Sequence, residues 1–151
     1  MKVKITRIDK SLPLPEYQTN GSVACDLYAR VETKIKPKEI KRVPGNVIIA
    51  TPKGYMFLIA SRSSTSLRKG LMPANGIGVG DQDFCGPEDE YQFTFFNYTN
   101  KTVTVERGER IAQGIFVPIE KASWVEVNSH NVKNRGGFGS TGSHIKTKTK
   151  K

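Results

Sequence analysis

Arg62, Ser63 and Ser64 form the stretch of this sequence that is best suited to bind phosphate. They follow the apolar run at residues 55–60 and open a short helical pattern that ends at Gly70. The start of a helix offers free backbone N–H groups, and a guanidinium offers a planar fork for two oxygens. An N-cap serine beside a surface arginine is the alternative interpretation.

A second stretch, residues 75–86, places carboxylates beside an aromatic ring. Three glycines alternate there with apolar residues, so a flat ligand or another backbone can approach closely. Asp81 and Asp83 follow, two residues apart and therefore on one face of an extended segment, and Phe84 comes next. This combination suits a nucleoside with water chemistry nearby. An ordinary hairpin with acidic turn residues is the alternative.

Two polar residues interrupt apolar strands elsewhere in the chain. Asp26 lies within "ACDLYA" and Gln113 within "GERIAQGIF". A buried polar group needs partners, so each side chain either faces a ligand or is satisfied locally. For Asp26 the local alternative is a strand-edge or turn-capping aspartate, and for Gln113 it is a backbone contact.

The C-terminal stretch "NRGGFGSTG", Asn134 to Gly142, contains four glycines and one large aromatic residue, Phe138. A passive linker before the basic tail does not explain that ring. A glycine-rich segment that is open when empty and closed over a ligand does explain it, because lids of this kind exclude water. We therefore expect a lid here.

The composition points to a polyanionic partner. The 151 residues include 24 Lys+Arg against 14 Asp+Glu, a net charge of +10. Nucleic acid, an anionic membrane surface and a small phosphate ester all fit this charge. The basic residues are scattered and the aromatic residues lie mostly within strands, so we expect no stable binding of nucleic acid.

The same composition indicates a cytoplasmic protein. No apolar run approaches the ~20 residues that cross a bilayer, and the N-terminus lacks the apolar stretch of a signal peptide. We therefore expect no membrane association. Cys25 and Cys85 show no disulfide framework, and with two histidines they make no recognisable zinc pattern.

Period-2 alternation of apolar residues predicts an all-β fold. Short strands with turn signals between them favour an antiparallel sandwich, jelly roll or small barrel, with one helix of about two turns at residues 63–70. We predict a core domain at residues 1–128, a glycine-rich arm at 129–142 and a basic tail at 143–151. The strand-like runs are residues 3–8, 24–29, 34–43, 46–51, 55–60, 91–99, 101–108, 111–119 and 123–127.

Taken in order, five stretches resemble the five motifs of the trimeric dUTPases. The resemblance runs from about residue 3 to residue 142. It implies a β jelly-roll or β-clip-type fold that assembles as a homotrimer, with three active sites at subunit interfaces. It also implies Mg²⁺-dependent hydrolysis of dUTP to dUMP and pyrophosphate, which keeps uracil out of DNA and supplies a thymidylate precursor. The motifs read "ACDLYA", "SRSS", "NGIGVGDQDF", "GERIAQGIF" and "GGFGSTG".

The resemblance assigns roles to individual residues. Asp81 is the catalytic residue, which orients a water for in-line attack on the α-phosphorus and takes its proton. Asp26 lies near the water shell of the Mg²⁺ ion, an indirect metal contact. The phosphate-binding residues are Arg62, Ser63, Ser64, Gln113, Arg135, Ser140 and Thr141. The nucleoside-binding residues are Asn75, Gly78, Phe84, Gln92 and Phe138, of which Phe84 packs on the deoxyribose and Phe138 covers the uracil.

The chain departs from the family pattern at several positions. Phe84 replaces the usual tyrosine and Gly80 replaces a β-branched residue, a change expected to loosen the hairpin. Residues 88–90 add three acidic side chains, which we interpret as a surface turn, with a second metal contact as the alternative. Either Lys133 or Arg135 meets the γ-phosphate, and the bidentate fork favours Arg135.

Two rival functions follow from the same residues. A dCTP deaminase shares the implied fold and a similar "RSS" segment, but it needs a catalytic glutamate on the strand after the third motif, where this chain reads "YQFTFFN". A basic β-domain that binds nucleic acid is the non-catalytic rival.

Overall fold

The computed structural model describes residues 1–138 and residue 140. The internal contacts divide the chain into a first unit, Met1–Glu120, and a second unit that begins at Lys121. Thr141 and the predicted tail at residues 143–151 lie outside the described residues. The predicted boundary between residues 128 and 129 stays a prediction.

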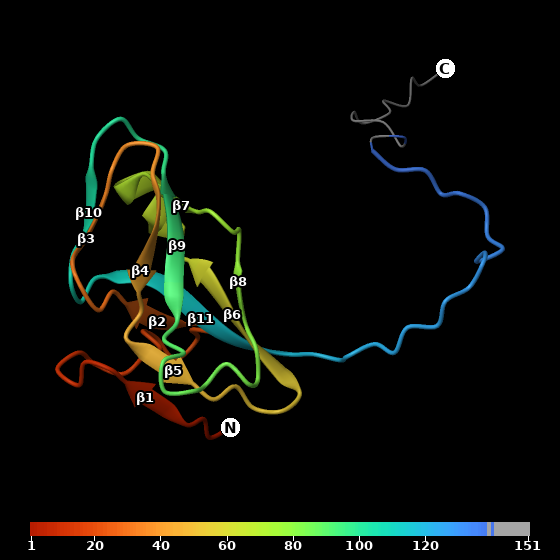
Figure 1. Ribbon diagram of the computed structural model, residues 1–151, viewed down its shortest axis with the longest axis horizontal. Coiled ribbons are helices and arrows are strands. Elements are labelled where there is room, and N and C mark those ends of the chain that lie inside the picture. Colours follow the sequence, from red (N-terminus) through yellow and green to blue (C-terminus); the bar gives the residue numbers. More distant parts are fainter. Residues whose placement is uncertain (139, 141–151) are drawn as a thin grey trace, which may run out of the picture. The chain divides into compact units, whose positions relative to one another are not determined.

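The first unit is built from short strands joined by turns (Figure 1). The strands pair antiparallel in four groups, ordered β1-β5, β10-β3, β2-β11-β6-β8 and β4-β9-β7. The all-β prediction is confirmed. The elements are β1 (Ile5–Arg7), β2 (Cys25–Tyr28), β3 (Thr33–Ile35), β4 (Ile40–Pro44), β5 (Val47–Ile49), β6 (Tyr55–Ser61), η1 (Thr65–Lys69), β7 (Leu71–Pro73), β8 (Gly78–Gly80), β9 (Gln92–Asn97), β10 (Val103–Val105) and β11 (Arg110–Pro118).

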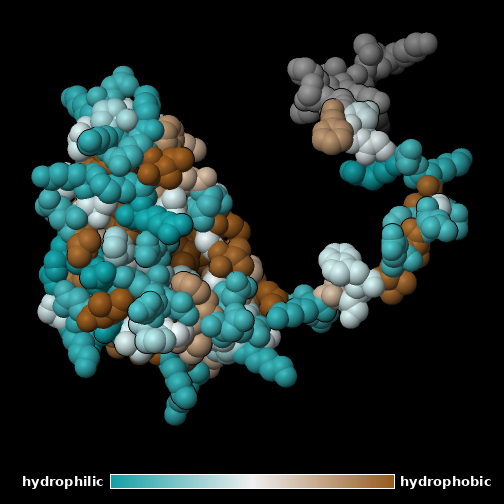
Figure 2. Space-filling model, viewed as in Figure 1, coloured by the Kyte–Doolittle hydropathy of each residue, from teal (hydrophilic) through white to brown (hydrophobic). Residues whose placement is uncertain are grey.

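The core lies between the sheets and collects the apolar residues of the alternating runs. In β9 every second residue is buried, with Phe93 and Phe95 inside, because successive side chains of a strand point to opposite faces. β5 is buried along its whole length. Figure 2 shows one face of the molecule, where hydrophilic residues predominate over smaller hydrophobic groups. The central buried residues include Leu27, Ile35, Val43, Phe57, Leu71, Val105 and Ile111.

The structure differs from the predicted elements in three places. Residues 34–43 form two strands, β3 and β4, because the chain turns at Pro37 and Lys38, where Lys38 has a φ of 60°. The helix is a single π-helical turn, which ends where Gly70 adopts a φ of 67°. Residues 123–127 form no strand among the described residues, and Trp124 is 93% exposed. A strand pattern needs a neighbouring strand to pair with.

Asn46 ties the N-terminal segment to the acidic residues before β9. It is buried and has a φ of 68°, a conformation that asparagine tolerates better than most residues. Its side chain accepts a hydrogen bond from the backbone N–H of Asp9 at 2.7 Å and donates one to the Asp9 carbonyl at 3.0 Å. Its own backbone N–H donates to the Glu90 carboxylate at 2.9 Å.

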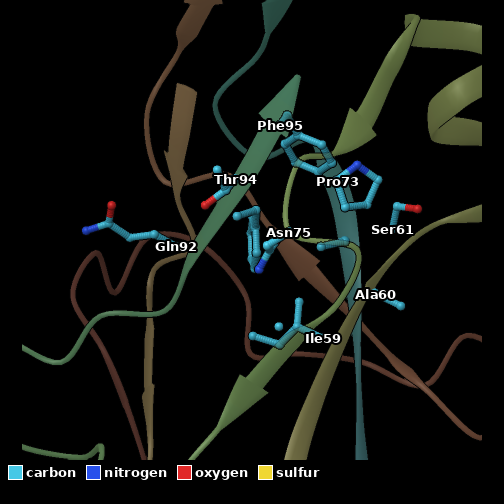
Figure 3. A pocket seen from close by; sticks show the side chains of 11 residues that line it. Ile59, Ala60, Ser61, Pro73, Asn75, Gln92, Thr94 and Phe95 are labelled. Atoms are coloured by element: carbon cyan, nitrogen blue, oxygen red, sulfur yellow. The ribbon is translucent and has the colours of Figure 1, made fainter. Parts of the chain in front are cut away.

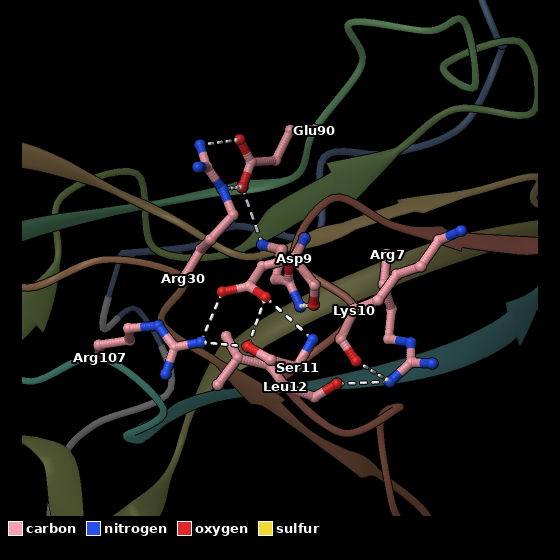
Figure 4. A network of polar contacts seen from close by, with 9 residues as sticks. Arg7, Asp9, Lys10, Ser11, Leu12, Arg30, Glu90 and Arg107 are labelled. Atoms are coloured by element: carbon pink, nitrogen blue, oxygen red, sulfur yellow. Dashed lines mark hydrogen bonds and ion pairs between the residues drawn. The ribbon is translucent and has the colours of Figure 1, made fainter.

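The Glu90 carboxylate and the Asp9 carboxylate belong to one polar network (Figure 4). Arg30 donates to both oxygens of Glu90, at 2.8 and 2.9 Å. Ser11 and Arg107 donate to Asp9, and these hydrogen bonds hold the pKa of Asp9 well below its usual range. Glu90, one of the three added acidic residues, is therefore a structural anchor for the loop that precedes β9.

Replacing Asn46 with alanine should lower the free energy of unfolding by about 2–3 kcal/mol, because two partly buried hydrogen bonds to Asp9 are lost. Urea denaturation followed by circular dichroism measures this change. The control is Asn100→Ala at an exposed position, which should stay within about 0.5 kcal/mol of the wild type. Equal midpoints for the two variants would contradict this role of Asn46.

Candidate active site

Strand pairing brings residues of three separate motifs to one end of the four-stranded sheet. β11 lies between β2 and β6, and its Gln113 pairs with Asp26 on one side and with Ala60 on the other. Arg62 follows β6 directly. The sheet therefore places Asp26, Gln113 and Arg62 together, although they lie far apart in the sequence.

The Asp26 carboxylate forms ion pairs with two arginines. It is only 6% exposed, and its oxygens lie 3.1 Å from Nε of Arg62 and 3.1 Å from a guanidinium nitrogen of Arg110. Arg62 also donates to the Arg110 carbonyl at 3.1 Å. A buried carboxylate needs such compensation. Asp26 is thus a buried ion-pair centre on β2, the edge strand of the four-stranded sheet.

Arg110 was not singled out by the sequence reasoning. It begins β11 and pairs with Tyr28, two residues beyond Asp26 on β2, and a register shift separates it from Ala112. Its basic side chain at the start of a strand gave no distinct signal, since the chain carries many scattered basic residues. Only the pairing of β11 with β2 reveals its contact with Asp26.

A basic cleft of about 290 Å³ opens beside this ion pair. Lys69 is paired there with Glu109 at 2.8 Å, whereas Arg68 is exposed. Ser64 lies at the N-cap of η1, but its side chain makes no capping hydrogen bond. The helix is too short for its dipole to contribute much to the binding of an anion. Side chains would have to provide the contacts with a phosphate. The cleft is lined by Arg62, Ser64, Thr65, Arg68, Lys69, Glu109, Arg110 and Ile111.

A second cleft, of about 360 Å³, contains five of the predicted site residues: Asn75, Gly78, Asp81, Phe84 and Gln92. Asp81 follows β8 and is exposed, so its carboxylate is accessible. The Phe84 ring is 38% exposed. Arg42 and Thr94 line the same cleft and were not predicted from the sequence.

A narrow pocket lies next to this cleft, between β6, β9 and the turn that joins β7 to β8 (Figure 3). Asn75, Gly78 and Gln92 line both spaces. The Asn75 side chain donates to the Ile77 carbonyl at 3.0 Å and so stiffens the turn. The turn's backbone can therefore serve as a fixed edge for a flat ring.

The two clefts lie far apart within one chain. Gly80, next to Asp81, pairs with Phe57 on β6, and Arg62 lies five residues beyond Phe57. At the usual rise of a strand, this separates Gly80, the neighbour of Asp81, from Arg62 by on the order of 16 Å. Ser63 is exposed and follows Arg62 directly, and Gln113 donates to the Ser61 carbonyl at 3.1 Å. Both therefore lie at the basic end of the sheet, the end that carries Arg62.

The second unit carries the remaining predicted residues that the structure describes. Phe138 is fully exposed and has a φ of 50°. Ser140 donates its backbone N–H to the Gly137 carbonyl at 3.0 Å, which forms a turn around Phe138. Lys133 and Arg135 are exposed as well.

The described residues contain no group of three His, Cys, Asp or Glu side chains that could hold a metal ion. An ion carried by a triphosphate needs no such group, because Mg²⁺ is typically held by substrate phosphates, water and one or two carboxylates. The residues present fit that arrangement. Across the described part of the chain, none of the helices has the length and apolar character that a membrane crossing requires.

Comparison with known proteins agrees with this geometry. The family model for dUTPase matches residues 10–142. The deoxyuridine 5′-triphosphate nucleotidohydrolase of Dictyoglomus turgidum is 38% identical over 148 residues, which cover 94% of this chain and 99% of that protein. The enzyme of the same name from Anaplasma marginale is also 38% identical, with the same coverage. The chain belongs to the dUTPase family.

Solved dUTPase structures share the fold. The Streptococcus mutans dUTPase superposes with a TM-score of 0.73 at 29% identity, covering 80% of this chain and 98% of that chain. A Staphylococcus bacteriophage 80alpha dUTPase, solved with dUPNHPP, gives 0.83 at 21% identity, with coverages of 94% and 99%. The predicted fold class, an all-β jelly roll of the dUTPase type, is confirmed.

In this member of the dUTPase family, replacing Asp26 with asparagine should lower the free energy of unfolding by about 2 kcal/mol. The buried carboxylate would no longer balance Arg62 and Arg110. Urea denaturation checks the change. Glu32→Gln is the control, because Glu32 and Lys34 form an exposed pair at 3.7 Å that should contribute less than about 0.5 kcal/mol. An equally small effect of Asp26→Asn would contradict the ion-pair role.

Proposed function

We propose that this protein hydrolyses dUTP to dUMP and pyrophosphate by in-line attack of water on the α-phosphate. Family membership makes it a dUTP diphosphatase, and the physiological role follows: it limits uracil in DNA and supplies dUMP for thymidylate synthesis. The observation that carries the proposal is the cleft that joins the exposed Asp81 carboxylate to Phe84 and the Asn75 turn.

Asp81 provides the chemistry in this proposal. Its carboxylate accepts a hydrogen bond from the attacking water, orients it, and takes its proton as the bond to phosphorus forms and the bond to the leaving pyrophosphate breaks. Because it follows the paired strand β8 directly, its backbone is fixed at one side. Positioning and charge neutralisation then supply most of the rate acceleration.

The nucleoside half of dUTP occupies the Asp81 cleft. Phe84 packs on the deoxyribose, where a 2′-hydroxyl would meet the ring, and this selects against UTP. The backbone near Asn75 and Gly78, together with Gln92 at the start of β9, reads the edge of uracil. The apolar part of the cleft favours the base, while few polar groups fix its orientation.

The basic cleft holds the phosphates. Arg62, Ser63 and Ser64 bind phosphate oxygens, with Gln113 on the adjacent strand. Arg110 supports Arg62 through Asp26 and the Arg110 carbonyl. Arginine pairs are well suited to this task because guanidinium groups bind phosphate oxygens bidentately.

We assign the protein a homotrimeric assembly in which neighbouring subunits share each active site. The separation of Gly80, the neighbour of Asp81, from Arg62, on the order of 16 Å along the sheet, supports this assignment because Asp81 and Arg62 must reach one triphosphate. A neighbouring subunit can bring its basic cleft to the Asp81 cleft. Closed point-group symmetry then repeats the shared site around the ring.

Mg²⁺ is the proposed cofactor, bound to the triphosphate, where it neutralises charge on the oxygens when present. Asp26 would reach it only through water. The glycine-rich arm is the proposed lid, with Phe138 over the uracil and Arg135, Ser140 and Thr141 toward the phosphates. Lys133 is the alternative to Arg135. The proposed location is cytoplasmic.

The Asp81→Asn variant should lose dUTP turnover by at least about 1,000-fold while it still binds dUTP, because the base is lost and the binding groups remain. Pyrophosphate release with Mg²⁺ measures turnover from dUTP, dCTP, dTTP and UTP. Glu88→Gln, an equal charge change in the same loop, is the control and should stay near wild-type activity. Ammonia released from dCTP, or no dUTP turnover by the wild type, would overturn the proposal.

Mixing two inactive variants tests the shared site. When Asp81→Asn and Arg62→Gln subunits are unfolded and refolded together, random mixing should make about a quarter of the sites complete. Each complete site would combine Asp81 of one subunit with Arg62 of another. Activity should therefore return in the mixture and stay absent from each variant refolded alone. A mixture that remains inactive would show that both residues act within one chain.

A further inference from the structure

The Tyr91 side chain packs directly against Gly80, the residue before Asp81. A Cβ atom on residue 80 would lie 2.1 Å from the Tyr91 hydroxyl oxygen and 2.8 Å from two carbons of its ring. Gly80 is not among the glycines with positive φ, so its backbone does not require glycine. The Tyr91 side chain therefore fills the volume that a side chain at residue 80 would take. The expected loosening of the hairpin stays a prediction.

Tyr91 also connects the hydrophobic core to the ring beside Asp81. It is 5% exposed and lies edge-on to Phe57, with ring centroids 5.4 Å apart. On its other side it lies edge-on to Phe84, with ring centroids 5.3 Å apart. Such aromatic pairs have a preferred geometry, so the position of Tyr91 influences the position of Phe84.

The backbone of Tyr91 is fixed independently of Gly80. Its N–H donates to the Val47 carbonyl at 2.9 Å, and its carbonyl accepts from the Gly45 N–H at 2.8 Å. The preceding Glu90 is held by Arg30 on both carboxylate oxygens. Tyr91 is thus a fixed support, against which the Asp81 loop packs.

The ring of Tyr91 makes the contacts with Phe57 and Phe84, whereas its hydroxyl oxygen is the atom closest to the Cβ position of residue 80. Among the described residues, neither the buried Tyr91 hydroxyl nor the buried Thr51 hydroxyl has a hydrogen-bond partner of good geometry. Burial raises the pKa of Tyr91; the nearby Thr51 opposes this, and the negative charge of Asp81 adds to it. The phenol therefore stays neutral.

We propose that the close packing of the Tyr91 side chain against Gly80, which we call the lock, positions Asp81 and Phe84 for dUTP hydrolysis. Tyr91 also lines the Asp81 cleft, but it is only 5% exposed, and we assign it as a positioning residue because its ring acts through Asp81 and Phe84. The lock sets both the rate of the chemical step and the discrimination between dUTP and UTP. This proposal rests on the proposed function of the Asp81 cleft.

Kinetics of four variants test the lock. Tyr91→Leu removes the ring and should lower kcat for dUTP about 10- to 100-fold, since small misplacements of a catalytic group are costly. The ratio of kcat/KM for dUTP over UTP should fall as well. Gly80→Ala should have the same two effects, because its Cβ displaces Tyr91. The double variant should lose much less than the product of the single effects, and Tyr91→Phe should stay near wild type.

Phe116→Leu is the matched control. Phe116 packs on the same core ring, Phe57, with centroids 4.8 Å apart, whereas Tyr91 is the side chain that packs against Phe84 and lies next to Gly80. The Phe116→Leu variant should have a lower melting temperature. Its kcat for dUTP, and its ratio of kcat/KM for dUTP over UTP, should stay near wild type. The control thereby separates loss of core packing from loss of positioning.

The outcomes distinguish the two proposals. Wild-type protein without dUTP turnover overturns the proposed function and the lock with it. Wild-type turnover with unchanged kcat and unchanged dUTP/UTP ratio in Tyr91→Leu and Gly80→Ala overturns the lock alone. Should Tyr91→Leu fail to fold, Gly80→Ala tests the same contact from the opposite side, and multiplicative effects in the double variant also overturn the lock.

Discussion

The buried carboxylate of Asp26 is the constraint on which the basic end of the structure depends. A negative charge that is almost wholly removed from water must be compensated, and two arginines from different segments do this. Arg62 and Arg110 are thereby held close together despite their like charge. The resulting cluster keeps two guanidinium groups beside one cleft, which a phosphate-binding site requires.

The Asp81 end depends instead on packing. Phe57 belongs to the core, Tyr91 packs edge-on to it, and Phe84 packs edge-on to Tyr91. This series of contacts extends the rigidity of the β domain into a loop that is otherwise exposed. Glu90 and Asn46 fix the same loop at its far side through buried hydrogen bonds. The loop that carries Asp81 is therefore supported at both ends without regular secondary structure.

The Asp26 end and the Asp81 end lie at separate places in one chain. Each chain carries the Asp81 cleft and the basic cleft, and the intervening length of β6 separates them. The proposed homotrimer would bring the two clefts of neighbouring subunits together.

The sequence by itself determined the all-β class, most strand positions and the family. The alternation of apolar and polar residues and the short motifs are local properties that can be read from the sequence alone. It also named Asp81, Phe84, Asn75 and Gln92, which share one cleft. It did not reveal Arg110 as a partner of Asp26, the anchoring of Glu90 by Arg30, or the contact of Gly80 with Tyr91. These depend on strand register and on volumes shared between distant segments, and such contacts are decided only when the sheets pair and pack.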